Sequence, residues 1–340
     1  MERHLRWGVL GAAGIARMAV VPAIARSRNG KLAAVATRSP ASAAAWAKEV
    51  GFHTVHASYE ALLADESVDA VYIPLPNSYH VEWTLKAAAA GKAVLCEKPL
   101  ALNADDAARL VSECRRLGTP LLEGFMYRFH PQHARVREIL RSGAIGEVVE
   151  VQAHLSVDLM SPADPENVRF DPKLGGGCIL DMGCYVASIP RFLLEEEPVD
   201  VIGRWQIDPA FGVDVSASAL FGFGSGISAT VSCSFRGNGQ GYYRVVGRKG
   251  LIDVPRGIIP GLGDRASETI IYVVDENGER REERLAPVDQ YQLMVEAFAD
   301  SILGGGPLPT SADDAVRNLR ALDAWTRSAK TCQPIAIPQG

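Results

Sequence analysis

The sequence lacks the features that would place it in several specialised classes of protein. Its six cysteines form no CxxC pair and are too few to cross-link 340 residues, so we expect reduced thiols and a cytoplasmic location. The formal net charge is −5 and no basic stripe is present, which disfavours a nucleic-acid partner. The first seven residues are charged and hold no apolar signal core.

Long apolar runs are also scarce. The longest stretch without charge, residues 215–235, is punctuated by serines and glycines and alternates as a strand does. Such a pattern is poor for a membrane-spanning helix, so we expect no membrane partner. The hydrophobic fraction of 47% and charged fraction of 22% are those of an ordinary globular protein, and the length accommodates two domains.

Short apolar runs alternate with helical stretches in the first third of the chain. We expect strands at residues 7–10, 31–37, 70–73, 93–96 and 120–123, and helices at 15–27, 40–50, 81–90 and 104–117. Strands that alternate with helices predict βαβ units and an α/β fold with a doubly wound parallel sheet. We place this Rossmann dinucleotide-binding domain at residues 1–124.

The pattern changes to a period of two beyond about residue 125. We expect strands at residues 147–155, 242–246, 251–254 and 269–274, a hairpin over 213–235 that turns at 224–226, and helices at 131–141, 289–303 and 311–330. Because these strands have no helices between them, they predict an antiparallel sheet in a second, α+β domain over residues 125–340.

A glycine-rich turn follows the first strand and opens the first helix. Gly11, Ala13 and Ala16 fit the pattern G-x-G-x-x-G/A, with alanine at its second position. In a Rossmann fold such a turn binds a pyrophosphate through backbone N–H groups, so we expect cofactor contacts from Gly11, Ala13, Gly14, Ile15 and Ala16. A tight strand-to-helix turn that binds no ligand is the alternative.

The end of the second expected strand carries no acid. A site for NAD usually has a carboxylate there that binds the ribose 2′-hydroxyl, whereas this chain has Thr37, Arg38 and Ser39. Arg38 can pair with a 2′-phosphate, and the two hydroxyl groups can donate to it, so we expect NADP rather than NAD. An ordinary solvent-exposed arginine in a loop is the alternative.

Four more segments carry polar groups in loops. They are residues 74–80 (PLPNSYH), 96–100 (CEKPL), 123–131 (EGFMYRFHP) and 174–185 (LGGGCILDMGCY). With the glycine turn, they resemble the Gfo/Idh/MocA family over nearly the whole chain. The resemblance implies a second domain with a large open, mostly antiparallel sheet. The outer face of such a sheet often forms the subunit interface, so we expect a homodimer or homotetramer.

The resemblance also assigns catalytic roles. Lys98 matches the catalytic lysine of the E-K-P motif and can hydrogen-bond the reacting hydroxyl; a surface lysine is the alternative. Asp181 matches the family's aspartate, but the position four residues later holds Tyr185 in place of histidine. This departure points to the branch of glucose–fructose oxidoreductase, dihydrodiol dehydrogenases and NADP-dependent xylose dehydrogenases. A helix from residue 179 would put both side chains on one face, with Tyr185 as the proton donor or acceptor. A core tyrosine is the alternative for Tyr185.

Further site residues follow from the same motifs. The expected cofactor contacts in the loops are Pro74, Leu75, Asn77, His80, Glu97, Lys98, Tyr127 and Arg128. The expected substrate contacts are Lys98, Arg169, Asp181 and Tyr185, with Asp158 and Phe170 as weaker candidates. The Lys98–Pro99 bond is open to either the cis or the trans form. The pair His130 and His133 has no evident third ligand, so we expect no metal site.

These residues together predict reversible hydride transfer between NADP(H) and a CH–OH carbon of a sugar or polyol. Aldose oxidation at C1 is the leading hypothesis, and sugar ketoreduction and trans-dihydrodiol oxidation are alternatives. A non-catalytic NADP-sensing regulator would have lost the lysine or the proton donor, yet both Lys98 and Tyr185 are present. A glycosidase that retains NAD would need additional acid and base groups.

Overall fold

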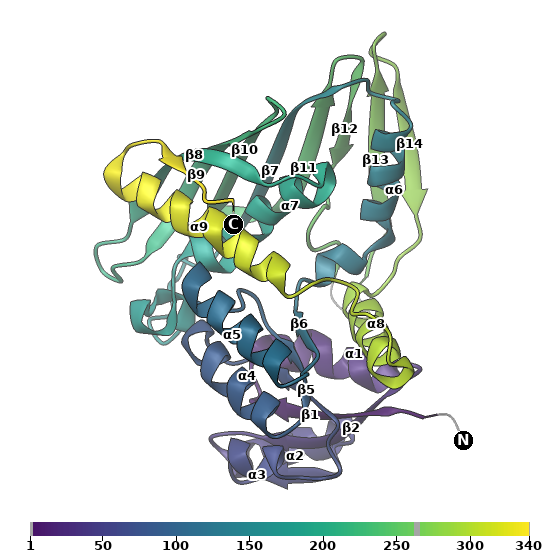
Figure 1. The fold of residues 1–340 in the computed structure, drawn as a ribbon, viewed down its shortest axis with the longest axis vertical. Helices are drawn as coiled ribbons and strands as arrows, with labels where there is room; N and C mark the ends of the chain where they lie inside the picture. The colour runs from purple at the N-terminus through teal and green to yellow at the C-terminus, as the bar shows by residue number, and fades with distance from the viewer. Residues whose placement is uncertain (1–2, 262–265, 340) are drawn as a thin grey trace. The chain divides into compact units, whose positions relative to one another are not determined.

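The computed structural model describes residues 3–261 and 266–339, with the backbone alone at positions 40 and 42. They form two compact units (Figure 1). The first unit contains residues 3–129, 261 and 289–316, and the second contains 130–260, 266–288 and 317–339. The expected division into domains at residue 124 stays a prediction; in the structure, residues 289–316 pack with the N-terminal unit.

A parallel sheet forms the centre of the first unit. Its strands are β1 (Leu5–Leu10), β2 (Gly30–Ala36), β3 (Thr54–His56), β4 (Ala70–Ile73), β5 (Ala93–Cys96) and β6 (Leu121–Glu123). They lie in the order β3-β2-β1-β4-β5-β6, with every pair parallel. All residues of β4 and β5 are buried, as expected for strands whose two faces are both covered by helices. This confirms the predicted doubly wound α/β fold.

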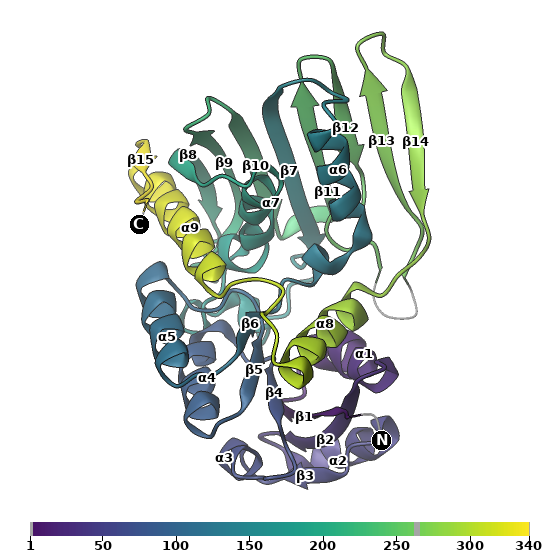
Figure 2. The same ribbon diagram turned by 45° about the vertical axis from the view of Figure 1, so that its right-hand side comes forward.

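Helices cover this sheet. They are α1 (Val21–Arg26), α2 (Pro40–Val50), α3 (Tyr59–Leu63), α4 (His80–Ala89), α5 (Ala104–Arg116) and α8 (Gln290–Gly304). Helix α4 packs on α5, while α1 packs on α8, and Figure 2 shows the two pairs on different sides of the sheet. The first expected helix differs from prediction, because it opens with a wide π-helical turn, Ala16–Val20, ahead of α1.

A nine-stranded sheet forms the second unit. Its strands are β7 (Val148–Asp158), β8 (Pro198–Ile207), β9 (Asp214–Phe223), β10 (Ser228–Ser234), β11 (Arg236–Gly247), β12 (Gly250–Val254), β13 (Thr269–Asp275), β14 (Arg280–Leu285) and β15 (Ile335–Ala336). The order is β14-β13-β12-β11-β7-β10-β9-β8-β15. Only the β7–β10 pair among these strands is parallel, so the predicted mostly antiparallel sheet is confirmed.

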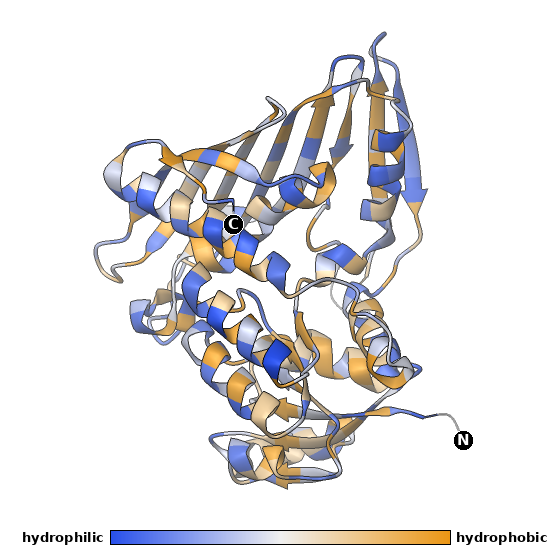
Figure 3. Ribbon diagram, viewed as in Figure 1, coloured by the Kyte–Doolittle hydropathy of each residue, from blue (hydrophilic) through white to orange (hydrophobic). Residues whose placement is uncertain are grey.

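One face of the second sheet packs against helices. These are α6 (Pro131–Arg141), α7 (Cys184–Leu194) and α9 (Asp313–Thr331), whose first residues belong to the first unit. Phe221 of β9 lies under Trp325 of α9, with ring centroids 6.0 Å apart. The strands alternate between hydrophilic and hydrophobic residues along their length (Figure 3). The burial pattern alternates in the same way, so the hydrophobic side chains of β9 and β10 point to the helices.

Several elements were not predicted. These are β3, α3, β8, β14 and β15, together with 3-10 turns at Asn77–Tyr79, Met126–Phe129, Val168–Phe170 and Pro172–Leu174. The sequence Arg280–Leu285 is almost entirely charged, and it forms the edge strand β14 (Figure 3). A charged edge strand is protected against pairing with other chains, but it lacks the apolar alternation by which strands are found.

One run, Pro172–Leu194, is long and apolar enough to cross a membrane by length and composition alone. Within the molecule, 78% of its most apolar window is buried, as in the core helix of a soluble protein. The six cysteines are all free thiols, and the Sγ atoms of Cys178 and Cys233 lie 3.6 Å apart.

Candidate active site

The glycine turn after β1 has the backbone that a phosphate-binding turn requires. Gly11 has φ +112°, and its N–H donates to the carbonyl of Ala36 at 2.8 Å, which fixes the turn beside the end of β2. A β-carbon on Gly11 would lie 3.2 Å from Leu75 Cδ2. Gly14 is exposed, so the backbone at the start of the helix is accessible to a ligand.

The residues after β2 are arranged as a polar loop without a carboxylate. The Oγ1 atom of the buried Thr37 accepts a hydrogen bond from Ser39 N at 3.2 Å. Arg38 is exposed. Burial raises the pKa of Tyr59, and the positive charge of Arg38 opposes that rise, so the guanidinium lies within electrostatic reach of this phenol.

His80 connects two of the predicted loops. Its Nδ1 atom lies 2.8 Å from the carbonyl oxygen of Pro99, and its Nε2 atom lies 2.8 Å from that of Leu75. The side chain is fully buried, and burial lowers its pKa although the two carbonyl contacts raise it. His80 therefore holds the loop after β4 against the loop after β5. Its predicted contact with a cofactor stays a prediction.

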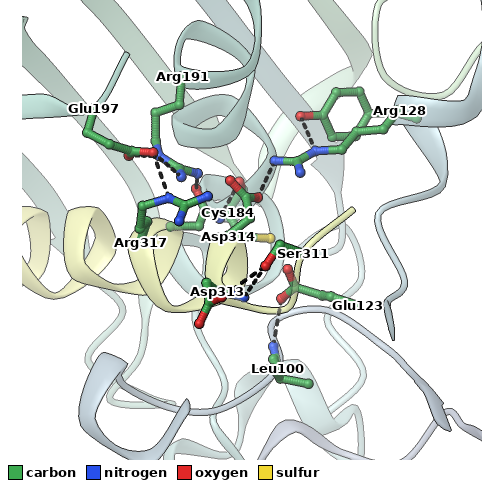
Figure 4. A network of polar contacts seen from close by, with 12 residues as sticks. Leu100, Glu123, Arg128, Cys184, Arg191, Glu197, Ser311, Asp313, Asp314 and Arg317 are labelled. Carbon is green, nitrogen blue, oxygen red and sulfur yellow. Dashed lines mark hydrogen bonds and ion pairs between the residues drawn. The ribbon is translucent and has the colours of Figure 1, made fainter. Parts of the chain in front are cut away.

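The loop that carries Lys98 is fixed at three further points. Tyr72 Oη donates to Glu97 Oε1 at 2.6 Å. Leu100 N donates to Glu123 Oε1 at 2.8 Å (Figure 4). Gly124 N donates to the carbonyl of Cys96 at 2.7 Å. The Lys98–Pro99 peptide bond is cis, and Lys98 itself is only half-buried between buried neighbours.

The sequence did not predict that Tyr72 and Glu123 hold the loop of Lys98. Tyr72 is in the middle of a fully apolar strand motif and is completely buried, so it resembles an ordinary core residue. Glu123 ends β6, and its carboxylate is buried. A carboxylate at the end of a parallel strand next to the E-K-P loop was the available signal.

Arg128 has an anionic partner within the first unit. Its side chain is 8% exposed, and Nη2 lies 2.6 Å from Oδ2 of Asp314 (Figure 4). Its Nε atom also lies 3.3 Å from the hydroxyl of the buried Tyr127. Asp314, which the sequence analysis did not single out, therefore neutralises Arg128. The predicted cofactor contacts of Tyr127 and Arg128 stay predictions.

In the second unit, the glycine-rich segment makes a tight loop before a helix. Gly175 and Gly177 have φ +80° and +108°, and a β-carbon on Gly176 would lie 2.6 Å from the carbonyl oxygen of Arg169. The Oδ2 atom of Asp214 accepts a hydrogen bond from Ile179 N at 2.7 Å, which supports the first turn of the helix. Burial raises the pKa of Asp214.

Asp181 and Tyr185 lie where this loop becomes helical. The segment from residue 179 is helical, but it opens with a π-helical turn, Ile179–Gly183, before α7. Arg169 Nε donates to Asp181 Oδ2 at 2.7 Å, and the two side chains are 44% and 16% exposed. Tyr185 is buried with only 6% exposure. Thus the structure pairs two of the predicted substrate residues, Arg169 and Asp181.

Helix α7 is anchored by a buried polar network in the second unit. Arg191 donates to Glu197 from Nε and Nη2, at 2.5 and 2.9 Å, and from Nη1 to Asn318 at 3.0 Å. Asn318 Nδ2 donates in turn to the carbonyl of Cys184, and Arg317 Nε donates to Glu197 (Figure 4). The residue before Tyr185 is therefore fixed by its backbone.

The remaining candidates have structural partners. His133 Nδ1 lies 2.9 Å from Tyr243 Oη, and His130 Nδ1 accepts from Gln132 N at 3.2 Å. Across residues 3–261 and 266–339, no group of three or more potential ligand side chains is arranged to hold a metal ion. Phe170 is buried and stacks on Phe211 at 4.5 Å, while Asp158 is exposed at the end of β7.

The fold and the motif loops define a Rossmann oxidoreductase with a second, sheet-based unit. Residues 5–125 match the oxidoreductase family with an NAD-binding Rossmann fold, GFO/IDH/MocA. Residues 133–253 match the C-terminal domain of the same family. The chain therefore belongs to the GFO/IDH/MocA family.

Individual relatives match this chain over most of its length. It is 39% identical to a D-xylose 1-dehydrogenase (NADP(+)) of Haloferax volcanii, over 96% of this chain and 98% of the relative. It is 37% identical to a dTDP-3,4-didehydro-2,6-dideoxy-alpha-D-glucose 3-reductase of Streptomyces violaceoruber, over 89% of this chain and 87% of the relative. Among solved structures, a 3-ketoreductase from Actinomadura kijaniata in complex with NADP and TDP-benzene matches with a TM-score of 0.89, 29% identity, and coverage of 96% and 98%.

Proposed function

We propose that this chain is an NADP(H)-dependent oxidoreductase that transfers hydride to or from a CH–OH carbon of a sugar or polyol. The observation that carries the proposal is the loop of Lys98. Four side-chain and backbone hydrogen bonds hold this loop, yet the lysine at its tip is only half-buried. A fixed backbone that presents one amine is what a positioned acid–base group requires.

The residues of the first unit fit a dinucleotide with a 2′-phosphate. The left-handed Gly11 brings backbone close to a ligand, and the exposed Gly14 opens the start of the helix. Arg38 is exposed at the end of β2 with no carboxylate beside it at positions 37 and 39. The relative from Haloferax volcanii, whose name specifies NADP(+), supports the same cofactor.

The bound nicotinamide supplies the hydride acceptor or donor. We assign the proton to the chain's own residues: Lys98 hydrogen-bonds the reacting oxygen through Nζ, and Tyr185 gives or takes the proton through Oη. Asp181 binds a neighbouring hydroxyl of the substrate, and Arg169 holds its carboxylate through the contact at 2.7 Å. A charge-assisted contact of that kind restricts the orientation of the carboxylate.

Oxidation of an aldose at C1 is the leading assignment, because it is the reaction class in the name of the 39%-identical relative. Sugar ketoreduction is the second candidate, and it is favoured by the 3-reductase of Streptomyces violaceoruber and the 3-ketoreductase from Actinomadura kijaniata. Because one fold can act on different substrates, a direct assay of turnover distinguishes these two reactions.

We also infer a cytoplasmic homo-oligomer. The free thiols support a reducing compartment. The outer face of the second sheet carries exposed apolar residues on neighbouring strands, with Ile202 of β8 paired to Leu220 of β9. These side chains are 45% and 46% exposed, and a subunit interface on this face would bury them.

The test is the absorbance of reduced nicotinamide with NADP or NAD, against a panel of aldoses, polyols, dihydrodiols and ketosugars. Lys98→Ala should lower turnover by about 10²- to 10⁴-fold. Lys31→Ala is the matched control, because Lys31 is an exposed lysine of the same unit at the start of β2. Turnover that survives in Lys98→Ala would contradict the role assigned to Lys98. Turnover with NAD alone would contradict the proposed dependence on NADP.

A further inference from the structure

Arg17 occupies a defined position beside the glycine turn, although the turn motif itself does not include it. It lies in the π-helical turn Ala16–Val20, and its Nε atom donates to the carbonyl of Ala12 at 3.0 Å. Its guanidinium carbon lies 4.3 Å from the ring centroid of Trp46 on α2. The guanidinium is thus held between the phosphate-binding turn and the helix that follows β2.

Arg17 and Arg38 are two cations close to the same turn. Gly11 is bonded to the end of β2, and Tyr59 Oη lies 3.7 Å from where a β-carbon on Gly11 would lie. The charge of Arg38 reaches the same phenol. Neither arginine forms an ion pair with a carboxylate among the described residues, unlike Arg26 and Arg28 further along the chain, which pair with acids. Two cations without carboxylate partners beside one turn favour a ligand with an additional negative charge.

We propose that Arg17 is a second residue that selects NADP over NAD, by binding the adenosine 2′-phosphate together with Arg38. This inference rests on the NADP dependence proposed above. Trp46 packs against the guanidinium, and the bond to Ala12 uses Nε rather than the Nη donors. We assign the Nη donors to the phosphate.

A purely structural Arg17, whose only task is to brace the turn through Ala12, makes a different prediction. Loss of such a brace would weaken every ligand that uses the turn, with or without a 2′-phosphate. A phosphate-binding Arg17 affects only ligands that carry the 2′-phosphate. The comparison of 2′,5′-ADP with 5′-AMP isolates this difference, since the two probes differ in that one phosphate.

The experiment measures dissociation constants of both probes by calorimetric titration of the full chain. Arg17→Ala should weaken 2′,5′-ADP by about 10- to 100-fold and 5′-AMP by less than about 3-fold. Arg17→Lys keeps the charge but loses the planar fork, so its loss for 2′,5′-ADP should be intermediate. Trp46→Leu keeps Arg17 but removes its platform, and should weaken 2′,5′-ADP by about 3- to 10-fold.

Arg109→Ala is the matched control, because Arg109 is an exposed arginine on α5 paired with Asp106. It should change neither constant. Equal losses of both probes in Arg17→Ala, or no loss of 2′,5′-ADP in that variant, would overturn the role of Arg17. If the unchanged protein binds 2′,5′-ADP no more tightly than 5′-AMP, the proposed NADP dependence itself fails, and this outcome is distinct from the other two.

Discussion

The two sheets of this chain bury their strands in different ways. In β4 of the parallel sheet, the consecutive residues Val71, Tyr72 and Ile73 are all fully buried. In β9 of the second sheet, Phe221 is 1% exposed and its neighbour Leu220 is 46% exposed. A sheet covered on both faces buries every side chain, whereas a sheet covered on one face buries alternate ones.

This difference decides where each unit has room for chemistry. The central strands β4 and β5 of the parallel sheet are fully buried. The predicted cofactor residues follow the strand ends instead, in the loops after β1, β2, β4, β5 and β6. In the second unit the predicted substrate residues Asp181 and Tyr185 belong to a helix instead, and that helix packs on the covered face of the sheet.

The largest expected effect tests the alternation in the second sheet. Phe221→Ala should lower the free energy of unfolding by about 3–5 kcal/mol, because it empties a core position beneath Trp325. Leu220→Ala, one residue away on the open face, should change it by less than about 0.5 kcal/mol. Urea unfolding followed by fluorescence measures both.

A scan of β4 completes the comparison. Val71→Ala should cost about 2 kcal/mol, and Tyr72→Phe should cost about 1–2 kcal/mol, since the latter removes the donor to Glu97 Oε1. In β4, therefore, substitution of either of two adjacent residues should lower the free energy of unfolding. A tolerant position in β4, or equal costs at Leu220 and Phe221, would contradict the description of the two sheets.

A buried histidine in the helical layer of the second unit should make the stability of the protein sensitive to acid. His130 is buried at the start of α6, and burial lowers its pKa to about 4. The unfolded chain, with an ordinary pKa near 6.5, binds the proton first as the pH falls. Stability is therefore complete above about pH 6.5 and falls by up to about 3 kcal/mol as the pH approaches 4.

His130→Asn isolates this contribution. Asparagine retains an acceptor for Gln132 N at the helix start but does not titrate, so stability at neutral pH should change little. The measurement is the urea midpoint at intervals from pH 7 to pH 4. The slope of stability against pH should be smaller in the variant, and an unchanged slope would show that another group is responsible.

The sequence was sufficient wherever apolar residues follow a simple period. Strands β1, β2, β4, β5 and β6 of the parallel sheet and the hairpin of β9 and β10 were predicted, since their patterns are those of buried and half-buried strands. The edge strand β14 was missed, because charged residues hide its alternation. The π-helical turns at Ala16–Val20 and Ile179–Gly183 leave no periodic signal in five residues.

For the site, the sequence identified the residues of the motifs but not their supports. Tyr72 reaches Glu97 and Arg128 reaches Asp314 across long separations in the chain. Such pairs depend on which strands and helices lie side by side, and no local pattern encodes that. His80 shows the same limit. A motif predicted its contact with the cofactor, but the motif did not indicate that both ring nitrogens face carbonyl groups.

The smallest expected effect on folding concerns the open face of the second sheet. Leu220→Asp places a charge beside Ile202 on the neighbouring strand, where both side chains are exposed within one chain. The free energy of unfolding of the separate chain should change by less than about 0.5 kcal/mol. If this face joins two copies of the chain, burial of the new carboxylate is unfavourable, and the oligomer should dissociate.

Light scattering after size-exclusion chromatography measures the mass directly. Leu117→Asp is the control, since Leu117 is also an exposed leucine, at 39%, but follows α5 in the parallel-sheet unit. A lower mass for Leu220→Asp alone would identify the open face of the second sheet as a subunit interface. The parallel sheet has both faces covered, so it offers no such surface. An unchanged oligomer in Leu220→Asp would place the interface elsewhere, and the exposed pair Ile202 and Leu220 would then be ordinary surface residues.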